Sequence, residues 1–357
     1  MSLGQAKVAI RTTAEENCRQ HDEKGGSRMH RMRLVALSAA FVLLAAGTAH
    51  ATFPGKDGSL TYSRFDEATS TLAIFSAEKR GQDERLLTNF GQGVFSQFSD
   101  WSPDGRLIAF DSDKGGAGPV TYVMRADGSH LRQLTDTSFS ADPGWAPDGK
   151  RIAIEADWGD YPAAEGIWTF PFHKQGLIGR ADAFRVTTTA PDAQFDSEPQ
   201  YSPDGTWIAF TRFQSAEESA IFRVRTDGTQ LEQLTDFAEN GSAPDWSPDG
   251  KWIAYDTHDA GIAPNAGNIV LIHPDGSGHW VLIAGTDTDY NQNPVFSPSG
   301  KFIAWALFGA TDGGSPPDIF TARVDGTHRR KLGVAGSTNK PDWGPKPEHR
   351  GRERHKH

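Results

Sequence analysis

Short apolar runs recur along the chain, and within them hydrophobic residues do not alternate with polar ones. The runs are Leu107–Phe110, Ile152–Ile154, Trp207–Phe210, Trp252–Tyr255 and Phe302–Trp305. A strand has this composition when both of its faces are covered, whereas a strand with one solvent face alternates. Long helical periodicities are scarce in the rest of the chain. The pattern therefore predicts many short strands that are buried on both sides.

A turn motif precedes each of these runs. Its first copy is Trp101-Ser102-Pro103-Asp104-Gly105, and further copies stand at 145–149, 201–205, 246–250 and 296–300. An incomplete copy stands at 343–345. Proline at the second turn position and glycine at the fourth suit a type I turn. The prolines of the six copies are 44, 56, 45, 50 and 47 residues apart. A period of about 40–50 residues without helices is typical of four-stranded propeller blades.

The rest of each unit supplies two more strands. Third strands are predicted at 121–125, 221–225, 269–273 and 319–323, and an Asp-Gly turn then leads to a fourth strand. The unit that starts at Trp145 instead carries an insertion at 173–183. Residues 56–88 supply a second, third and fourth strand without a first, and residues 341–343 supply a first strand alone. We therefore expect an all-β, six-bladed propeller over 52–345, closed by a composite blade from both termini.

The two ends of the chain differ from this body. A basic segment at 29–33, an apolar run from Leu34 to Ala46 and the Ala49-His50-Ala51 motif predict a signal peptide over 29–51, with cleavage near Ala51. The thirteen apolar residues are fewer than the ~20 that span a bilayer. We expect residues 1–28 either to lie before the true translation start or to be disordered, and residues 346–357 to be a disordered basic tail. The mature protein is then extracytoplasmic, either periplasmic or secreted, with no stable membrane span.

Charge and cysteine content narrow the possible partners. Residues 1–51 hold seven basic and four acidic residues, and residues 346–357 hold five basic and two acidic ones. This leaves 24 basic and 40 acidic residues in 52–345, a net charge of −16. Such a body repels nucleic acid and favours cations or basic partners. Cys18 is the only cysteine, so neither an intramolecular disulfide nor a cysteine-based zinc site can form. No histidine falls on a predicted first strand, which argues against a histidine metal centre.

The repeated aromatic-Ser-Pro-Asp-Gly motif, the Ile-Ala-aromatic run and the later Asp-Gly turn resemble the TolB-like, WD40-like propeller repeat family. The resemblance covers essentially all of 53–345 and implies a propeller fold, export and a binding role. TolB carries a separate α/β domain before its propeller, and we expect none here because strands begin within ten residues of the predicted cleavage site. Similar propellers precede the catalytic domain of prolyl oligopeptidase-like hydrolases, but this chain has no Gly-x-Ser-x-Gly elbow. Oligogalacturonide lyase, a further resemblance, holds a metal on clustered histidines.

Candidate binding residues stand where the repeats differ, because the fold does not demand a particular residue there. The first strand of each blade should border the central channel, since its prolines, two positions before each aromatic, are tolerated mainly on strand edges. The residues flanking these prolines should point the same way, toward the channel mouth. The candidates are Phe98, Asp100, Asp142, Glu198, Gln200, Asp245, Asn293, Lys340 and Asp342. The loops between second and third strands add acids to this face: Asp111, Asp113, Asp157, Asp160, Glu217, Glu218, Asp256, Asp259 and Asp312.

The predicted function is a non-catalytic binding module that uses this channel mouth and needs no cofactor or metal. Its partner is an envelope or extracellular protein, or a small polar ligand in the channel, and the protein is expected to be a monomer. Two alternatives use the same residues. One is a small-sugar binder, and the other is a lyase or hydrolase acting on polysaccharide or peptide with Asp142, Glu198 and Lys340 as acid/base groups. A channel that holds only water and solvated groups is the third possibility.

Overall fold

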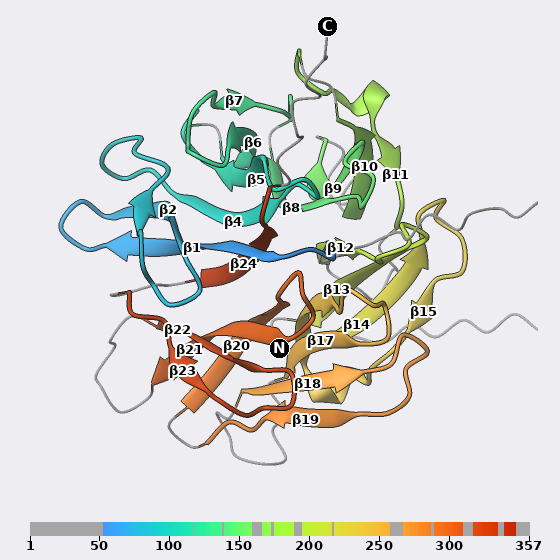
Figure 1. Ribbon diagram of the computed structural model, residues 1–357. Helices are drawn as coiled ribbons and strands as arrows, with labels where there is room; N and C mark the ends of the chain where they lie inside the picture. Colours follow the sequence, from blue (N-terminus) through green and yellow to red (C-terminus); the bar gives the residue numbers. More distant parts are fainter. Residues whose placement is uncertain are drawn as a thin grey trace, which may run out of the picture. The chain divides into compact units, whose positions relative to one another are not determined.

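Six antiparallel sheets surround a common centre in the computed structural model (Figure 1). The structure describes residues 53–347 except for 117, 138, 159–165, 173–174, 189–194, 216–217, 258–266, 287–288, 310–316 and 335–338. The predicted signal peptide and all but the first two residues of the predicted tail lie outside the described residues. No helix in the described part is long and apolar enough to cross a membrane.

Each sheet is one blade of four strands, named here in chain order. Blade 1 holds β4 (Ser96–Trp101), β5 (Leu107–Ser112), β6 (Val120–Arg125) and β7 (Arg132–Gln133). Blade 2 holds β8 (Phe139–Trp145), β9 (Arg151–Asp157), β10 (Gly166–Pro171) and β11 (Phe184–Arg185). Blade 3 holds β12 (Phe195–Tyr201), β13 (Trp207–Ser215), β14 (Glu218–Arg225) and β15 (Glu232–Gln233).

Blade 4 holds β16 (Gly241–Trp246), β17 (Ile253–Thr257), β18 (Asn268–Ile272) and β19 (Trp280–Ile283). Blade 5 holds β20 (Asp289–Phe296), β21 (Phe302–Gly309), β22 (Asp318–Arg323) and β23 (Arg330–Lys331). The closing blade joins β24 (Asn339–Pro345) to β1 (Asp57–Asp66), β2 (Thr71–Ala77) and β3 (Arg85–Leu86). Two single-turn 3₁₀ segments, η1 (Arg180–Asp182) and η2 (Phe237–Glu239), complete the described elements. The predicted six-bladed propeller with a composite closing blade is confirmed.

The Ser-Pro-Asp-Gly turn connects the first two strands of a blade. In blade 1 the Ser102 hydroxyl donates to the Asp104 carboxylate at 2.8 Å and accepts the Leu107 N–H at 2.9 Å. Gly105 closes the turn with φ near +66°, a conformation that glycine adopts without a steric penalty. The same serine–aspartate pair recurs in blades 3 and 4. These turns fix how the second strand leaves the first.

The hydrophobic core lies between the blades and forms a separate layer at each junction. Ile108 and Phe110 of β5 pack toward the closing blade, whereas Ala109 between them packs toward blade 2. Second strands are therefore covered on both faces, which explains their unbroken apolar runs. Burying one such side chain contributes roughly 1.5–3 kcal/mol.

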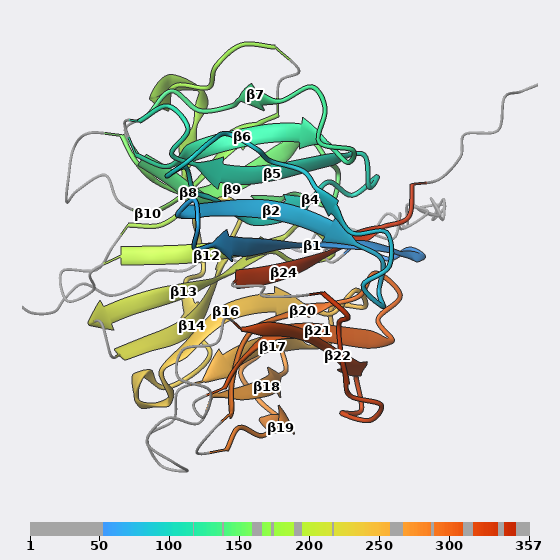
Figure 2. The same ribbon diagram turned by 90° about the vertical axis from the view of Figure 1, so that its left-hand side faces the viewer.

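The first strands of successive blades contact one another all the way around, from β24 through β4, β8, β12, β16 and β20 and back to β24. Figure 2 shows β24, in dark red, beside the blue β1. Their pairing brings Trp343 opposite Leu60, and the Trp343 indole donates to the Gly58 carbonyl oxygen at 3.3 Å. The first strands therefore line the centre, as predicted.

The insertion in blade 2 ties it to blade 1. Ile178 is buried and forms a parallel bridge with Thr135. Its N–H donates to the Leu134 carbonyl oxygen at 2.7 Å, and its own carbonyl oxygen accepts the Asp136 N–H at 2.8 Å. The segment thus replaces the usual turn with contacts across a blade junction.

Candidate functional site

All six first strands contain the same distortion. In each strand, the residue three positions before the repeated aromatic has a left-handed backbone. Its φ is 51° at Phe98, 48° at Asp142, 58° at Glu198, 52° at Ala243, 54° at Asn293 and 21° at Lys340. In blades 1 to 5 the register with the second strand shifts at this residue. Such a β-bulge redirects side chains, and bulges are frequent beside binding and active sites. Five of the six residues precede proline, a position at which the backbone is normally extended.

The bulges direct the variable side chains into one cavity. The cavity has a volume of about 60 Å³ and is lined by all nine residues singled out from the sequence. They were expected to converge through simple alternation along a strand. The structure instead brings them together through the bulge, which turns the residue before proline inward. Their convergence is observed, and their binding role remains a prediction.

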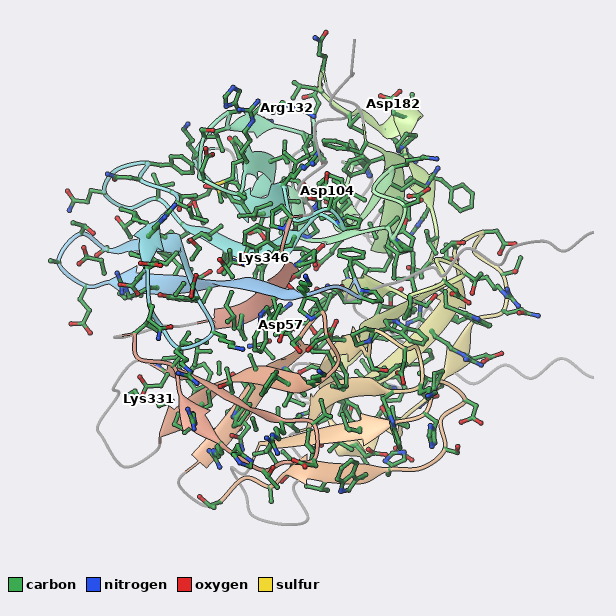
Figure 3. All side chains as sticks on the ribbon, in the orientation of Figure 1. Asp57, Asp104, Arg132, Asp182, Lys331 and Lys346 are labelled. Carbon is green, nitrogen blue, oxygen red and sulfur yellow. The ribbon has the colours of Figure 1, made fainter. Side chains whose placement is uncertain are left out.

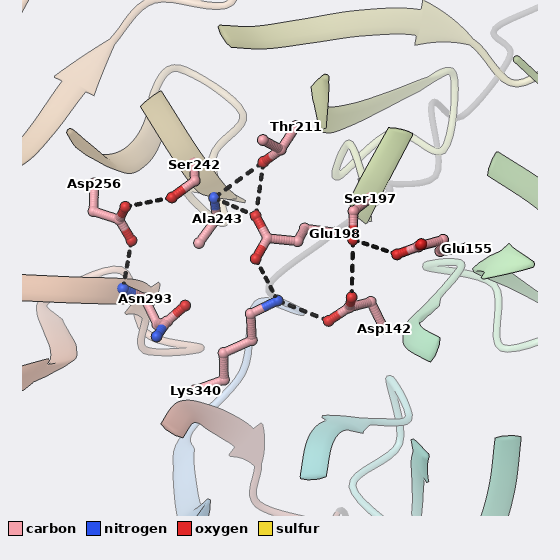
Figure 4. Close-up of polar contacts among 10 residues, drawn as sticks. All are labelled: Asp142, Glu155, Ser197, Glu198, Thr211, Ser242, Ala243, Asp256, Asn293 and Lys340. Carbon is pink, nitrogen blue, oxygen red and sulfur yellow. Dashed lines mark hydrogen bonds and ion pairs between the residues drawn. The ribbon is translucent and has the colours of Figure 1, made fainter. Parts of the chain in front are cut away.

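A buried ion-pair cluster occupies the mouth of this cavity (Figure 4). Lys340 Nζ from β24 lies 2.7 Å from Asp142 Oδ1 of β8 and 2.8 Å from Glu198 Oε1 of β12. The three side chains are only 10–17% exposed. The ammonium also lies 4.4 Å from the centre of the Phe98 ring, within the range of a cation–π contact. Residues from four blades thus meet at one positive charge.

This arrangement shifts the pKa of each charged member. Burial raises the pKa of the Asp142 carboxyl more than the Lys340 ammonium lowers it, and the charge of Glu198 adds to the rise. Burial acts on Glu198 too, but Lys340 and hydrogen bonds from Thr211 and the Ala243 N–H hold its pKa below the ordinary value. For Lys340, attraction to the two carboxylates outweighs burial and raises its pKa. The lysine and Glu198 are therefore both charged at neutral pH.

Side chains of the second strands support the bulges from behind. Asp256 accepts the backbone N–H of Asn293 at 2.7 Å, and the Ala243 N–H donates to Glu198 at 2.6 Å and to Thr211 at 3.1 Å. Ser197 donates to Glu155 at 2.5 Å and to Asp142 at 3.0 Å. Thr211 and Ser197 were not singled out from the sequence. Thr211 directly follows the apolar run Trp207–Phe210, which could have singled it out, whereas Ser197 lies in a mostly polar strand and carries no such signal.

The acidic residues after the second strands occupy different environments. Asp111 and Asp256 are about 1% exposed and lie within the second strands β5 and β17, so they do not belong to the predicted acidic rim. Burial and the nearby charge of Asp142 raise the pKa of Asp111 well above its ordinary value. Among the described residues, Asp111 Oδ1 has no hydrogen-bond partner. Asp113 and Asp157 are partly exposed and Glu218 is exposed, while Asp160, Glu217, Asp259 and Asp312 lie outside the described residues.

A second ring of carboxylates lies deeper in the channel. Asp342 accepts the Trp101 N–H, Asp100 the Trp145 N–H and Asp245 the Phe296 N–H, each at 2.7 Å. In every case the donor belongs to the next blade, so these aspartates connect neighbouring blades. The sequence presented them only as ligand candidates.

Burial raises the pKa of two of these aspartates. For Asp342 the pKa reaches about 7, and for Asp100 it lies well above the ordinary value because the charge of Asp342 adds to the effect of burial. Below this ring, a pocket of about 20 Å³ is lined by Trp101, Trp145 and Phe53, among others. Phe53, at the start of the described chain, is buried against Trp145 and was not anticipated as part of the channel.

The side chains that could hold a metal ion are histidine, cysteine, aspartate and glutamate. The described residues contain no group of three or more histidine, cysteine, aspartate or glutamate side chains arranged to hold a metal ion. Lys340 occupies the space between Asp142 and Glu198 where a cation would otherwise be expected. The described channel is therefore an acidic site with an internal counter-ion.

Comparison with known proteins gives the same result for the fold. Residues 179–347 match the family model of the TolB beta propeller domain. TolB from Acinetobacter baumannii superimposes with a TM-score of 0.66 at 22% identity, covering 82% of this chain and 68% of that chain. A candidate TolB from Agrobacterium tumefaciens has a TM-score of 0.58 at 17% identity and covers 82% of this chain and 92% of that one.

A further relative is known from sequence. The uncharacterized peptidase YuxL of Bacillus subtilis is 28% identical over 137 residues, which cover 31% of this chain and 21% of that protein. The match spans about a fifth of that relative's length, and the two structural likenesses show the fold. The resemblance to TolB-like propellers is confirmed: residues 179–347 match the TolB beta propeller domain, and the described six-bladed ring has the fold of the TolB propellers.

Proposed function

We propose that this protein is an extracytoplasmic, non-catalytic binding module that engages a partner through its channel mouth and holds a cationic group of that partner there. Removal of the predicted signal peptide near Ala51 is part of the proposal, as is the monomeric state. The partner is an envelope or extracellular protein.

The observation that carries the proposal is the excess of buried carboxyl groups over cationic groups around Lys340. Asp142 and Glu198 both pair with one ammonium, and the buried Asp111, whose carboxyl interacts with the charge of Asp142, has no hydrogen-bond partner at Oδ1 within the described part of the chain. Buried carboxylates favour any cation that can reach them, because burial penalises their unpaired charge. The body around the channel has a net charge of −16 and attracts such a group from a distance.

The size of the cavity favours a single side-chain head over a sugar. A volume of about 60 Å³ holds roughly four to six water-sized groups, which is less than a sugar ring occupies. A lysine ammonium or an arginine guanidinium fits this space while the rest of the partner rests on the surrounding loops. The small-sugar alternative therefore receives less support.

Acid/base catalysis is also less well supported. A general acid or base works best with a pKa near the working pH. Of the three candidate acid/base groups, the pKa values of Lys340 and Glu198 are shifted away from neutrality, in opposite directions. Only the pKa of Asp142 rises toward neutrality, and that carboxyl is held by Lys340 at 2.7 Å. A lyase or hydrolase at this site would show turnover of polysaccharide or peptide that Glu198→Gln abolishes, and that result would refute the non-catalytic assignment.

An affinity capture from cell envelope and culture medium tests the proposal. The wild type should retain a partner at 20 mM salt and release it at 500 mM, because salt screens the attraction between charges. The double variant Asp142→Asn/Glu198→Gln removes two charges while keeping oxygen acceptors for Lys340, and it should lose the partner.

A matched control removes two charges at the other end of the blades. Asp227→Asn/Asp325→Asn alters exposed turns and should retain the partner as the wild type does. If the channel variant retains the partner equally well, recognition takes place elsewhere. Salt-independent binding of a neutral sugar would favour the sugar-binding alternative.

A further inference from the structure

A larger concave surface lies between blades 1 and 2, at the end of the propeller opposite the channel mouth. It is formed by the turn after β4, the turn after β6 and Phe172, which follows β10, and its volume is about 960 Å³. This is within the range of about 300–1,000 Å³ typical of small-molecule sites. Figure 3 shows Asp104 and Arg132, which both line it, over blade 1.

The floor of this groove is apolar. Leu107 and Phe172 pack on the hydrophobic cluster between the two blades, and the Phe172 ring meets Trp145 edge-on at 4.6 Å. Leu131 packs on the neighbouring cluster of blade 1. All three side chains are only partly buried, so the floor offers apolar surface to a ligand.

The rim carries three arginines. The Arg132 guanidinium lies 5.4 Å from the centre of the Phe172 ring, and Arg106 and Arg125 are exposed. Asp104 and Asp127 also line the groove. Asp104 accepts a hydrogen bond from Ser102 and lies 3.8 Å from the Arg106 guanidinium, and Asp127 accepts a hydrogen bond from Ser129. Three arginines against two aspartates leave the groove with an excess of one positive charge on a strongly acidic body.

The repeat itself provides an internal comparison. The equivalent groove between blades 3 and 4 has a volume of about 450 Å³ and is lined by one arginine, Arg223, and two aspartates, Asp204 and Asp249. The positive charge between blades 1 and 2 is thus a property of this junction and is not imposed by the fold. Pro347 lines the groove as well, and the ten residues after it include four basic and two acidic ones.

We propose that the groove between blades 1 and 2 binds a small amphipathic anion, with an apolar chain or ring that ends in a carboxylate or phosphate group. The apolar part would cover Leu107, Leu131 and Phe172 and so leave water. The head group would pair with the guanidinium groups of Arg106 and Arg125, whose fork-shaped donors match carboxylate and phosphate oxygens. This site is separate from the channel mouth, so it stands or fails independently of the proposed function.

Titration calorimetry with three probes of equal chain length tests the site. Dodecanoate and dodecyl phosphate, below their micellar concentrations, should each saturate one site. Comparing their dissociation constants shows which head group is preferred. Dodecyltrimethylammonium, with the same chain and a cationic head, should bind at least about tenfold more weakly.

Two double variants complete the test. Arg106→Glu/Arg125→Glu should weaken dodecanoate binding at least about tenfold, whereas the matched control Arg330→Glu/Lys331→Glu on blade 5 should stay within about twofold of the wild type. All four side chains are exposed, so both variants should keep the wild-type melting temperature. Equal binding of the cationic probe, or unchanged binding by the groove variant, would overturn the proposal. So would binding only to phosphatidylglycerol vesicles and to neither free anionic probe.

Discussion

The residues that line the channel mouth have an unusual backbone conformation as well as unusual side chains. A left-handed backbone costs an L-residue roughly 1–2 kcal/mol, and the following proline restricts it further. The structure offsets this cost with specific partners, such as the bonds from the Ala243 N–H to Glu198 and Thr211. Backbone strain of this kind concentrates at functional sites.

Ala243 allows that strain to be measured without touching a charge. Replacing it by glycine should leave stability unchanged or raise it by up to about 1 kcal/mol, because glycine adopts φ near +52° freely. Ala243→Val should destabilise by more than about 1 kcal/mol, since a β-branched side chain fits this conformation poorly. Urea unfolding of the two variants gives both values. A valine variant as stable as the wild type would show that the bulge is not strained.

Lys340 should be essential to the stability of the channel. Lys340→Met keeps the length of the side chain but leaves Asp142 and Glu198 buried without a counter-charge, which should cost about 3–5 kcal/mol at pH 7.5. The loss should shrink toward pH 4 as these carboxyl groups become protonated. Lys331→Met, which breaks an exposed pair with Asp318, should cost less than about 1 kcal/mol. Urea unfolding at both pH values measures the difference.

The raised pKa of Asp342 predicts that the stability of the fold depends on pH. Its pKa is about 7 in the folded protein, and that of an unfolded aspartate is about 3.9. The folded state therefore binds this proton more tightly, so the contribution of Asp342 to stability falls as pH rises from about 4 to about 7. Asp342→Asn cannot acquire the charge. It should melt roughly 2–5 °C above the wild type at pH 8, and this advantage should disappear near pH 4. A constant difference across this range would contradict the assignment.

At the scale of elements, the sequence predicted the blades and their boundaries well. Second strands such as Leu107–Ser112 were recognisable because burial on both faces leaves an unbroken apolar run. The bulges were not, since a left-handed residue before proline has no compositional signature: Asp142, Ala243 and Lys340 share no chemistry. The prediction therefore named residues that do converge on one cavity, but for an incorrect geometric reason. Phe53 and the blade-connecting role of Asp100 depend on contacts between distant segments, which periodicity cannot show.

The closing strand gives the prediction at this scale. Deleting residues 339–357 removes β24, so β1 loses the partner on its inner edge and β4 and β20 lose their contacts with β24. That chain should not fold to a stable ring, because an unpaired strand edge and an open core junction remain. Deleting only 348–357 should leave the melting curve unchanged. Circular dichroism of the two truncations separates these outcomes, and equal melting of both would mean that β24 does not close the ring.

At the scale of the whole molecule, two ends of one ring differ in charge. The channel mouth is acidic around a single ammonium, while the opposite end carries the arginines of the groove between blades 1 and 2. The repeat fixes the scaffold at both ends and leaves a few positions per blade to vary. This division explains why the fold could be predicted from residues that recur in every blade. What each end can bind could not be predicted in this way, because it depends on residues that occur once.

Closure of the ring by β24 also determines when the site comes into existence. The contact between Trp343 and Gly58 joins residues 285 positions apart, and pairings of such separation form slowly. The same strand brings Lys340 between Asp142 and Glu198. Until it docks, a partly folded chain has two unneutralised carboxylates and no complete mouth. The capacity to bind should therefore arise in the final step of folding, so that an unfinished propeller cannot capture the partner.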